Sequence, residues 1–253
     1  MPSEPRAEWL RPDPDALGPQ VRALMTTRGF NLGRKAGPAE QVRAHREELA
    51  RHLGARPVFL DQVHGADVVR LQPQLHDDNA PRADAAVSTD PELAVAVLVA
   101  DCLPVLFAAP GGVAGAHAGW RGLAGGVLEN TVAALCEAAG CERRDVRAWL
   151  GACIGPEAFE VGPEVVAAFG REPLTRDQPL FAFRPNPAPR WRADLAGLAR
   201  ERLTAAGVGA IAGGQWCTLS EESRFFSFRG EARGRPVGRM AACIALGGLG
   251  ALG

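Results

Sequence analysis

Residues 93–118 read LAVAVLVADCLPVLFAAPGGVAGAHA and are the most strongly apolar part of the chain. It contains three runs that are nearly continuous in hydrophobic residues, Leu93–Val99, Val105–Ala109 and Val113–His117. Such runs are typical of strands that are buried on both faces. Pro104 is predicted to end strand pairing, because proline has no N–H to donate. The segment therefore predicts the central strands of a large core.

Further predicted elements lie on both sides of this segment. Strands are predicted at Val21–Thr27, Pro57–Leu60, Val68–Leu71, Asp84–Thr89, Val146–Ile154, Val208–Ala212, Phe225–Phe228 and Arg239–Leu246. Helices are predicted at Pro38–Leu53, Leu123–Ala139, Pro163–Phe169 and Trp191–Ala206. Because strands and helices do not alternate strictly, the α+β class is favoured over a doubly wound sheet. No linker-like stretch divides the chain, so we expect one domain over residues 21–253 after an N-terminal extension, residues 1–20.

The composition argues against several classes of function. The 28 basic and 29 acidic residues leave a net charge of −1, which removes the electrostatic argument for nucleic acid or an anionic membrane. The Pro-rich start of the chain has no apolar core of a signal peptide. The longest apolar stretch is interrupted by Asp101 and Cys102 and falls short of the roughly 20 residues of a membrane span. We expect a cytoplasmic protein whose six cysteines are free thiols.

Three polar segments interrupt the apolar pattern at the ends of predicted strands. DQVHG (residues 61–65) follows a strand, DC (101–102) lies between two strands, and HAGWRG (117–122) joins a strand to a helix. Glycine in the last segment permits unusual backbone, and helical N–H groups after Gly122 would favour an anion. The Arg121 guanidinium would bind phosphate or carboxylate through two N–H groups, or form an ion pair with Asp101 or another carboxylate of the chain.

The three segments carry a set of side chains that two kinds of chemistry use. His64, Cys102 and His117 can fill three of the four positions around Zn²⁺ and leave one for water or substrate. The same groups also fit a Cys–His nucleophilic pair. Spacing along the chain does not decide between a metal site and a nucleophile, because the three residues are far apart in sequence.

Several longer segments resemble one known family. They are LDQVHGADVV (60–69), ADAAVSTD (83–90), ADCLPVLF (100–107), HAGWRGLAGGV (117–127), GACIGPEAFEVGPEV (151–165) and CTLSEESRFFSFRGEARGRPVGRMAACIAL (217–246). Together they resemble the laccase-domain family, also called the YfiH-like or multicopper polyphenol oxidoreductase family, over about residues 21–246. The resemblance implies a single α+β domain, with mixed sheets in a sandwich flanked by helices, similar in fold to Cys–His deamidase toxins.

The resemblance also implies a function and a site. Members of the family are purine nucleoside phosphorylases that act on adenosine, inosine, guanosine and methylthioadenosine with phosphate, and they deaminate adenosine. The implied zinc ligands are His64, Cys102 and His117. Under this reading Cys102, Asp101 and His117 are the catalytic candidates, with Asp101 either holding a metal-ligating His or acting as acid and base. Phosphate would bind Arg28 and Arg121, and Gln62 would contact a base edge or a ribose hydroxyl.

The sequence departs from the family pattern in two ways. The glycine-rich stretch that usually follows the early TTR motif is shortened here after Arg28, which puts the shape of the substrate pocket in question. Positions that usually carry tyrosine hold Phe159, Leu219 and Phe228. The loss of these hydroxyls is expected to affect substrate preference without touching the metal.

Three other functions stay open beside the phosphorylase. One is a metal-free hydrolase with Cys102 as nucleophile and His117 as base. Another is a polyphenol oxidase, but copper is less favoured than zinc because a multicopper cluster needs many imidazoles. The chain has five His, and His45, His52 and His76 are expected to be peripheral. The last is a non-catalytic metal-binding protein.

Overall fold

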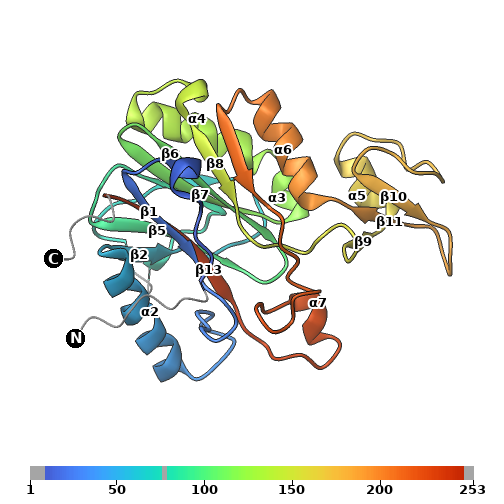
Figure 1. The fold of residues 1–253 in the computed structure, drawn as a ribbon, viewed down its shortest axis with the longest axis horizontal. Coiled ribbons are helices and arrows are strands. Elements are labelled where there is room, and N and C mark those ends of the chain that lie inside the picture. The colour runs from blue at the N-terminus through green and yellow to red at the C-terminus, as the bar shows by residue number, and fades with distance from the viewer. Residues whose placement is uncertain (1–8, 76–78, 248–253) are drawn as a thin grey trace.

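The computed structural model describes residues 9–75 and 79–247, which form one α+β domain (Figure 1). Two large mixed sheets pack face to face, as predicted. One has the strand order β12-β8-β6-β7-β4-β3 and the other β1-β13-β5-β2. Their strands are β1 (Val21–Met25), β2 (Arg56–Phe59), β3 (Val68–Arg70), β4 (Ala85–Ser88), β5 (Leu93–Val99), β6 (Leu103–Ala109), β7 (Gly112–Ala118), β8 (Arg147–Leu150), β12 (Ala210–Gly213) and β13 (Met240–Leu246).

Helices cover the outer faces of the two sheets (Figure 1). On the six-stranded sheet lie α4 (Val127–Ala139) and, packed on it, α6 (Leu195–Ala205), whereas α2 (Ala39–Leu53) lies beside β2 of the other sheet. A small third sheet of β9 (Glu160–Val161), β10 (Phe181–Arg184) and β11 (Arg190–Ala193) projects from the body. The short elements are α1 (Pro14–Leu17), α3 (Trp120–Ala124), the 3-10 helix Arg143–Asp145, α5 (Pro163–Ala168) and α7 (Phe228–Glu231).

The central strands are buried on both faces because each contributes to two hydrophobic layers. In β5, Val95 and Val97 belong to the layer between the sheets, whereas Ala94 and Ala96 face the layer with α2. The strand β13 alternates in the same way. Successive side chains of a strand point to opposite faces, so a strand between two apolar layers must be apolar throughout. This is why residues 93–118 are nearly continuous in hydrophobic residues.

Several predicted boundaries were wrong, and glycine or a capping side chain explains two of them. The predicted helix Leu123–Ala139 is two helices, α3 and α4, separated at Gly126, whose φ of 93° is left-handed. The predicted helix Trp191–Ala206 starts as strand β11, and α6 begins only after Asp194, whose side chain accepts a hydrogen bond from the Gly197 N–H. The capping residue therefore marks the true start of the helix.

Two strand predictions also fail in detail. Pro104 does not end pairing, because β6 includes it and pairs it with His117 of β7. The Pro104 carbonyl still accepts a hydrogen bond from the Gly151 N–H. The segment Phe225–Phe228 is not a strand, since Ser227 caps the helix α7 that begins at Phe228.

The described part of the predicted N-terminal extension packs on the domain. Trp9, Leu10 and Leu17 are buried, and Leu10 exchanges backbone hydrogen bonds with Met25 at the end of β1. Among the helices of residues 9–75 and 79–247, none combines the length and hydropathy needed to cross a bilayer.

Candidate metal centre

His64, Cys102 and His117 come together beside the start of β6 and the end of β7, where the loop after β2 carries His64. One ligand atom from each lies within 4.8 Å of the others. The Cys102 Sγ is 3.9 Å from His64 Nε2, and the two imidazole rings meet edge to face with their centroids 4.8 Å apart. The strand β7 places His117 opposite Pro104, two residues from Cys102. Pairing of β6 with β7 therefore sets the thiol beside one of the imidazoles.

Asp84 organises both histidines, and the sequence analysis missed it. Its buried carboxylate lies 2.8 Å from His117 Nδ1. It also accepts hydrogen bonds from the backbone N–H groups of Val63, His64 and Gly65, at 3.1, 2.9 and 2.6 Å. One side chain thus holds the imidazole of His117 and the loop that carries His64. A carboxylate on the far nitrogen of a ligating histidine fixes its tautomer and leaves the other nitrogen for a metal.

His64 itself has an unusual backbone. Its φ is 62°, in the left-handed region that residues other than glycine seldom adopt. The three N–H groups bound to Asp84 hold it there. A strained conformation that the surrounding structure maintains is common at functional sites.

The electrostatics of the group favour a thiolate beside a cationic imidazole. Burial alone raises the pKa of the Cys102 thiol, but hydrogen bonds from His117 and His64 outweigh it and lower that pKa from 9.0 to about 6. Burial lowers the pKa of His117, but hydrogen bonds to Asp84 and Cys102 raise it to about 9. The thiolate is the form of cysteine that both binds metals and attacks as a nucleophile.

The three side chains fit a zinc ion. Zinc binds nitrogen at about 2.0–2.1 Å and thiolate sulfur at about 2.3 Å, so ligand atoms around one tetrahedral ion lie roughly 3.4–3.7 Å apart. The 3.9 Å between Cys102 Sγ and His64 Nε2 is close to that spacing. His117 is buried and His64 is exposed, so one side of the group faces solvent. Three protein ligands and an open side are the arrangement of catalytic zinc sites.

We expect the Cys102 thiol to react at unusually low pH in metal-free protein. A thiolate that forms with a pKa of about 6 is alkylated at a rate that rises through pH 6, whereas an ordinary thiol reaches half of its maximal rate near pH 9. Mass spectrometry of iodoacetamide-treated peptides measures this directly. Added Zn²⁺ should suppress alkylation at Cys102 and leave that at the half-buried Cys136 unchanged. A half-maximal rate near pH 9 would contradict the thiolate.

Asp101 does not have one of its two predicted roles, that of holding a metal-ligating histidine. Its carboxylate accepts hydrogen bonds from the Thr218 and Ser227 hydroxyls and from the Arg229 N–H, at 2.6, 3.0 and 2.7 Å. It therefore does not hold a histidine, because Asp84 does so. Its φ of 83° turns the chain just before Cys102. Asp101 ties the segment 218–229 to the residue that carries the thiol.

The other sequence-predicted site residues have separate partners. The amide of Gln62 makes two 2.8 Å hydrogen bonds with the backbone of Leu98, so both of its polar groups are engaged in the sheet. The Arg28 guanidinium donates to the Glu222 carbonyl. Arg121 is exposed and lies over the Trp120 ring, 4.5 Å from its centroid. The predicted ion pair of Arg121 with Asp101 is not formed.

The helix next to the site begins earlier than predicted and packs tightly on it. Gly119 is the residue before α3, which starts at Trp120 and not after Gly122. A Cβ at Gly119 would lie 3.0 Å from Cys102 Sγ and 3.1 Å from His64 Cδ2. A Cβ at Gly122 would lie 2.6 Å from the Gly65 carbonyl oxygen. Glycine at both positions lets the helix approach the ligands.

Replacing Gly119 with alanine should loosen the metal site without unfolding the protein. Alanine tolerates the φ of −62° at this position, so the effect is steric: the methyl group displaces Cys102 or His64. We expect zinc affinity to fall about tenfold, equivalent to about 1.4 kcal/mol of overpacking, as measured by competition with a chelator. Gly29→Ala is the control, because nothing lies within 4 Å of its added Cβ. Equal affinities for the two variants would show that α3 leaves room at the ligands.

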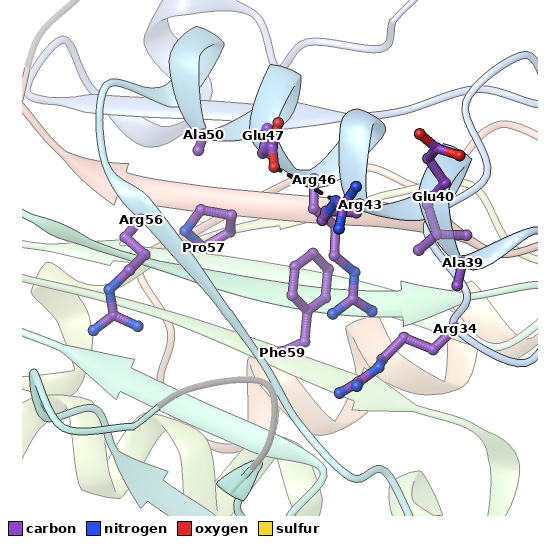
Figure 2. Close-up of a pocket in the computed structure, with 11 residues that line it drawn as sticks. Arg34, Ala39, Glu40, Arg43, Arg46, Glu47, Ala50, Arg56, Pro57 and Phe59 are labelled. Atoms are coloured by element: carbon purple, nitrogen blue, oxygen red, sulfur yellow. Dashed lines mark ion pairs between the residues drawn. The ribbon is translucent and has the colours of Figure 1, made fainter.

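A large pocket lies elsewhere and contains none of these residues. It has a volume of about 1020 Å³ between α2 and β2, and Figure 2 shows Arg46 beside Phe59 within it. Arg46 and Arg56 donate to backbone carbonyls there, and Arg43 pairs with Glu47. His45 and His52 lie on α2, away from the metal group, and His76 lies outside the described residues.

Comparison with known proteins places the chain in a family. The family described as multi-copper polyphenol oxidoreductase laccase matches residues 23–247. The chain belongs to this family. Purine nucleoside phosphorylase PA4543 of Pseudomonas aeruginosa is 43% identical over 250 residues, which cover 93% of this chain and 97% of that protein. Purine nucleoside phosphorylase YfiH of Escherichia coli is 43% identical over 220 residues, 85% of each chain.

Solved structures agree with the fold of this laccase-family chain. The Neisseria meningitidis protein NMB0706 superposes with a TM-score of 0.82 at 38% identity, covering 95% of this chain and 100% of that one. YlmD from Geobacillus stearothermophilus gives a TM-score of 0.83 at 30% identity, covering 96% and 97%. The predicted family and fold are thereby confirmed.

Proposed function

We propose that this chain is a zinc-dependent purine nucleoside phosphorylase that also deaminates adenosine. The convergence of His64, Cys102 and His117 within 4.8 Å carries the proposal. It is supported by relatives named purine nucleoside phosphorylase that match nearly the whole chain. The proposed substrates are adenosine, inosine, guanosine and methylthioadenosine, with phosphate. The free cysteines fit a place in the reducing cytoplasm.

The donor set supports zinc more than a copper cluster. In residues 9–75 and 79–247, a single group of His, Cys, Asp and Glu side chains has metal-binding geometry, and it offers three ligand atoms. A multicopper cluster needs more imidazoles than this group has. Bound zinc supplies a Lewis acid that lowers the pKa of water or stabilises developing negative charge.

Other side chains have proposed roles in orienting a ligand, binding phosphate and shaping the site. Asp84 holds the Nδ1 proton of His117, so that Nε2 faces Cys102 and His64. Arg121 is exposed at the start of α3, and Gly119, the residue before this helix, lies against the candidate ligands. We assign Arg121 to phosphate. Arg28 is a second phosphate residue in the proposal. For Gln62 we propose a role in shaping the site through its Leu98 hydrogen bonds, and not direct contact with a base.

The test is phosphate dependence. Inosine should yield hypoxanthine and ribose 1-phosphate only when phosphate is present. Arg121→Ala should raise the KM for phosphate about tenfold or more and leave the KM for inosine nearly unchanged, because the side chain contacts only one substrate. Hypoxanthine release at full rate without phosphate would exclude phosphorolysis. A parallel rise in both KM values with a lower melting temperature would assign Arg121 a structural role instead.

A metal-free hydrolase is the second candidate, favoured by one observation. The Cys102 thiol lies within 4.8 Å of ring nitrogens of both His64 and His117, and hydrogen bonds to these imidazoles lower its pKa to about 6. A thiol beside an imidazole is the arrangement of an activated thiol nucleophile. Such an enzyme would work after chelation of metal and would form a covalent substrate adduct on Cys102. Retained turnover in chelator, together with that mass shift, would replace the phosphorylase proposal.

A further inference from the structure

Phe228 is an exposed aromatic side chain on the segment tied to the metal centre. It is 63% exposed, and the other large hydrophobic residues exposed in residues 9–75 and 79–247 are Val63 and Val237. A single exposed hydrophobic residue needs no special explanation. The surroundings of Phe228, however, distinguish it from an ordinary surface residue.

Both neighbours of Phe228 are bound to one buried carboxylate. The Ser227 hydroxyl and the Arg229 N–H lie 3.0 and 2.7 Å from Asp101 Oδ2. Asp101 directly precedes Cys102, so bond lengths and these contacts place the Phe228 Cα at most about 13 Å from that of Cys102. The backbone that carries the exposed ring is therefore attached, through a buried carboxylate, to the residue next to the thiol.

One flank of the ring already has a cationic neighbour. The Arg239 guanidinium carbon lies 5.8 Å from the Phe228 ring centroid. Arg239 is itself held by an ion pair with Glu231 on α7. Val63, the residue before the candidate ligand His64, is also exposed. Two exposed apolar side chains thus lie on segments whose backbone is hydrogen-bonded at the polar centre, one through Asp84 and one through Asp101. Apolar and polar groups in this combination suit a ligand with a flat apolar body and polar edges.

We infer that Phe228 is the surface on which the purine ring of the substrate packs. This inference rests on the proposed phosphorylase function and names a residue that determines its substrate range. A phenyl face makes no hydrogen bond to a base edge, and stacking of this kind tolerates different bases. It therefore accommodates adenine, guanine and hypoxanthine alike. Phenylalanine at this position keeps the stacking face without a hydroxyl.

The test compares nucleoside binding with phosphate binding. Phe228→Ala should raise the KM for inosine and for adenosine about tenfold or more, the usual effect of losing a stacking partner, with the KM for phosphate unchanged. Phe228→Tyr should restore the nucleoside KM. Val237→Ala is the matched control, because it removes another exposed apolar side chain of the same C-terminal segment and is expected to leave both KM values unchanged.

A direct measurement separates this inference from the proposed function. Phe228→Trp provides a fluorophore that bound adenosine should quench, and calorimetry measures nucleoside affinity of the unaltered chain and of Phe228→Ala without turnover. If inosine is turned over and Phe228→Ala binds it as tightly as Val237→Ala does, the inference is wrong and the phosphorylase stands. If the unaltered chain neither turns over nor binds nucleosides, both are wrong. Binding without turnover, weakened about tenfold by Phe228→Ala, supports the inference and overturns the phosphorylase.

Discussion

Cys102→Ala should abolish both phosphorolysis and deamination while the protein stays folded. The change removes the one sulfur ligand, and loss of the metal's electrostatic contribution of several kcal/mol corresponds to a fall of about 10³-fold or more in kcat/KM. Zinc measured in protein purified without added metal should fall from about one per chain to near zero. The hydrophobic layers do not include the metal, so cooperative thermal unfolding should persist.

The control for this prediction is the same substitution at a remote thiol. Cys136→Ala alters a half-buried cysteine of α4 and should retain zinc and activity. Failure of Cys102→Ala to fold would identify a structural metal. If Cys102→Ala lost activity yet kept its zinc, the thiol would be a nucleophile and not a ligand.

Asp84→Ala should destabilise the protein and weaken metal binding together. Without the carboxylate, His117 Nδ1 and the N–H groups of residues 63–65 lose their partner. Breaking a buried ion pair from one side costs about 3–5 kcal/mol of unfolding free energy. Loss of a carboxylate behind a ligating histidine lowers metal affinity about 10–100-fold. Denaturant unfolding and chelator competition measure the two effects, and Asp61→Asn, an exposed aspartate of the neighbouring segment, is the control.

The same residue makes the metal-free protein sensitive to acid. Burial raises the pKa of Asp84, but the hydrogen bonds from His117 and the Gly65 N–H outweigh it, so the pKa lies below the ordinary 3.8. A carboxyl group whose pKa is lower in the folded chain than in the unfolded chain stabilises the fold. This stabilisation is fully present above the pKa of the unfolded chain and is lost as the pH falls through the pKa of the folded chain. Chelator-treated protein should therefore lose stability below about pH 4, and Asp84→Asn should show a smaller loss. Equal acid sensitivity of the two proteins would remove Asp84 from this role.

Residue types at predicted strand ends and in apolar runs were enough to single out the three candidate ligands and the core. The runs of residues 93–118 are nearly continuous in hydrophobic residues, and this pattern indicated strands buried on both faces. His64, Cys102 and His117 stood out as ligand-type residues at strand ends, and the structure brings them together. These features could be predicted because hydrophobic burial and ligand chemistry depend on residue type alone.

The tertiary structure alone decided which carboxylate serves the site. Asp101 had the conspicuous position beside Cys102, yet its oxygens hold the segment 218–229. Asp84 directly precedes strand β4. In the sequence it was distinguished only as a charged residue before the apolar run Ala85–Val87. Its partners are the three backbone N–H groups of residues 63–65 and the His117 imidazole on β7. Nearly every residue has the same backbone N–H group, so the sequence does not show which of these groups a side chain will bind. A hydrogen-bonding role that depends on them can be identified only in the folded chain.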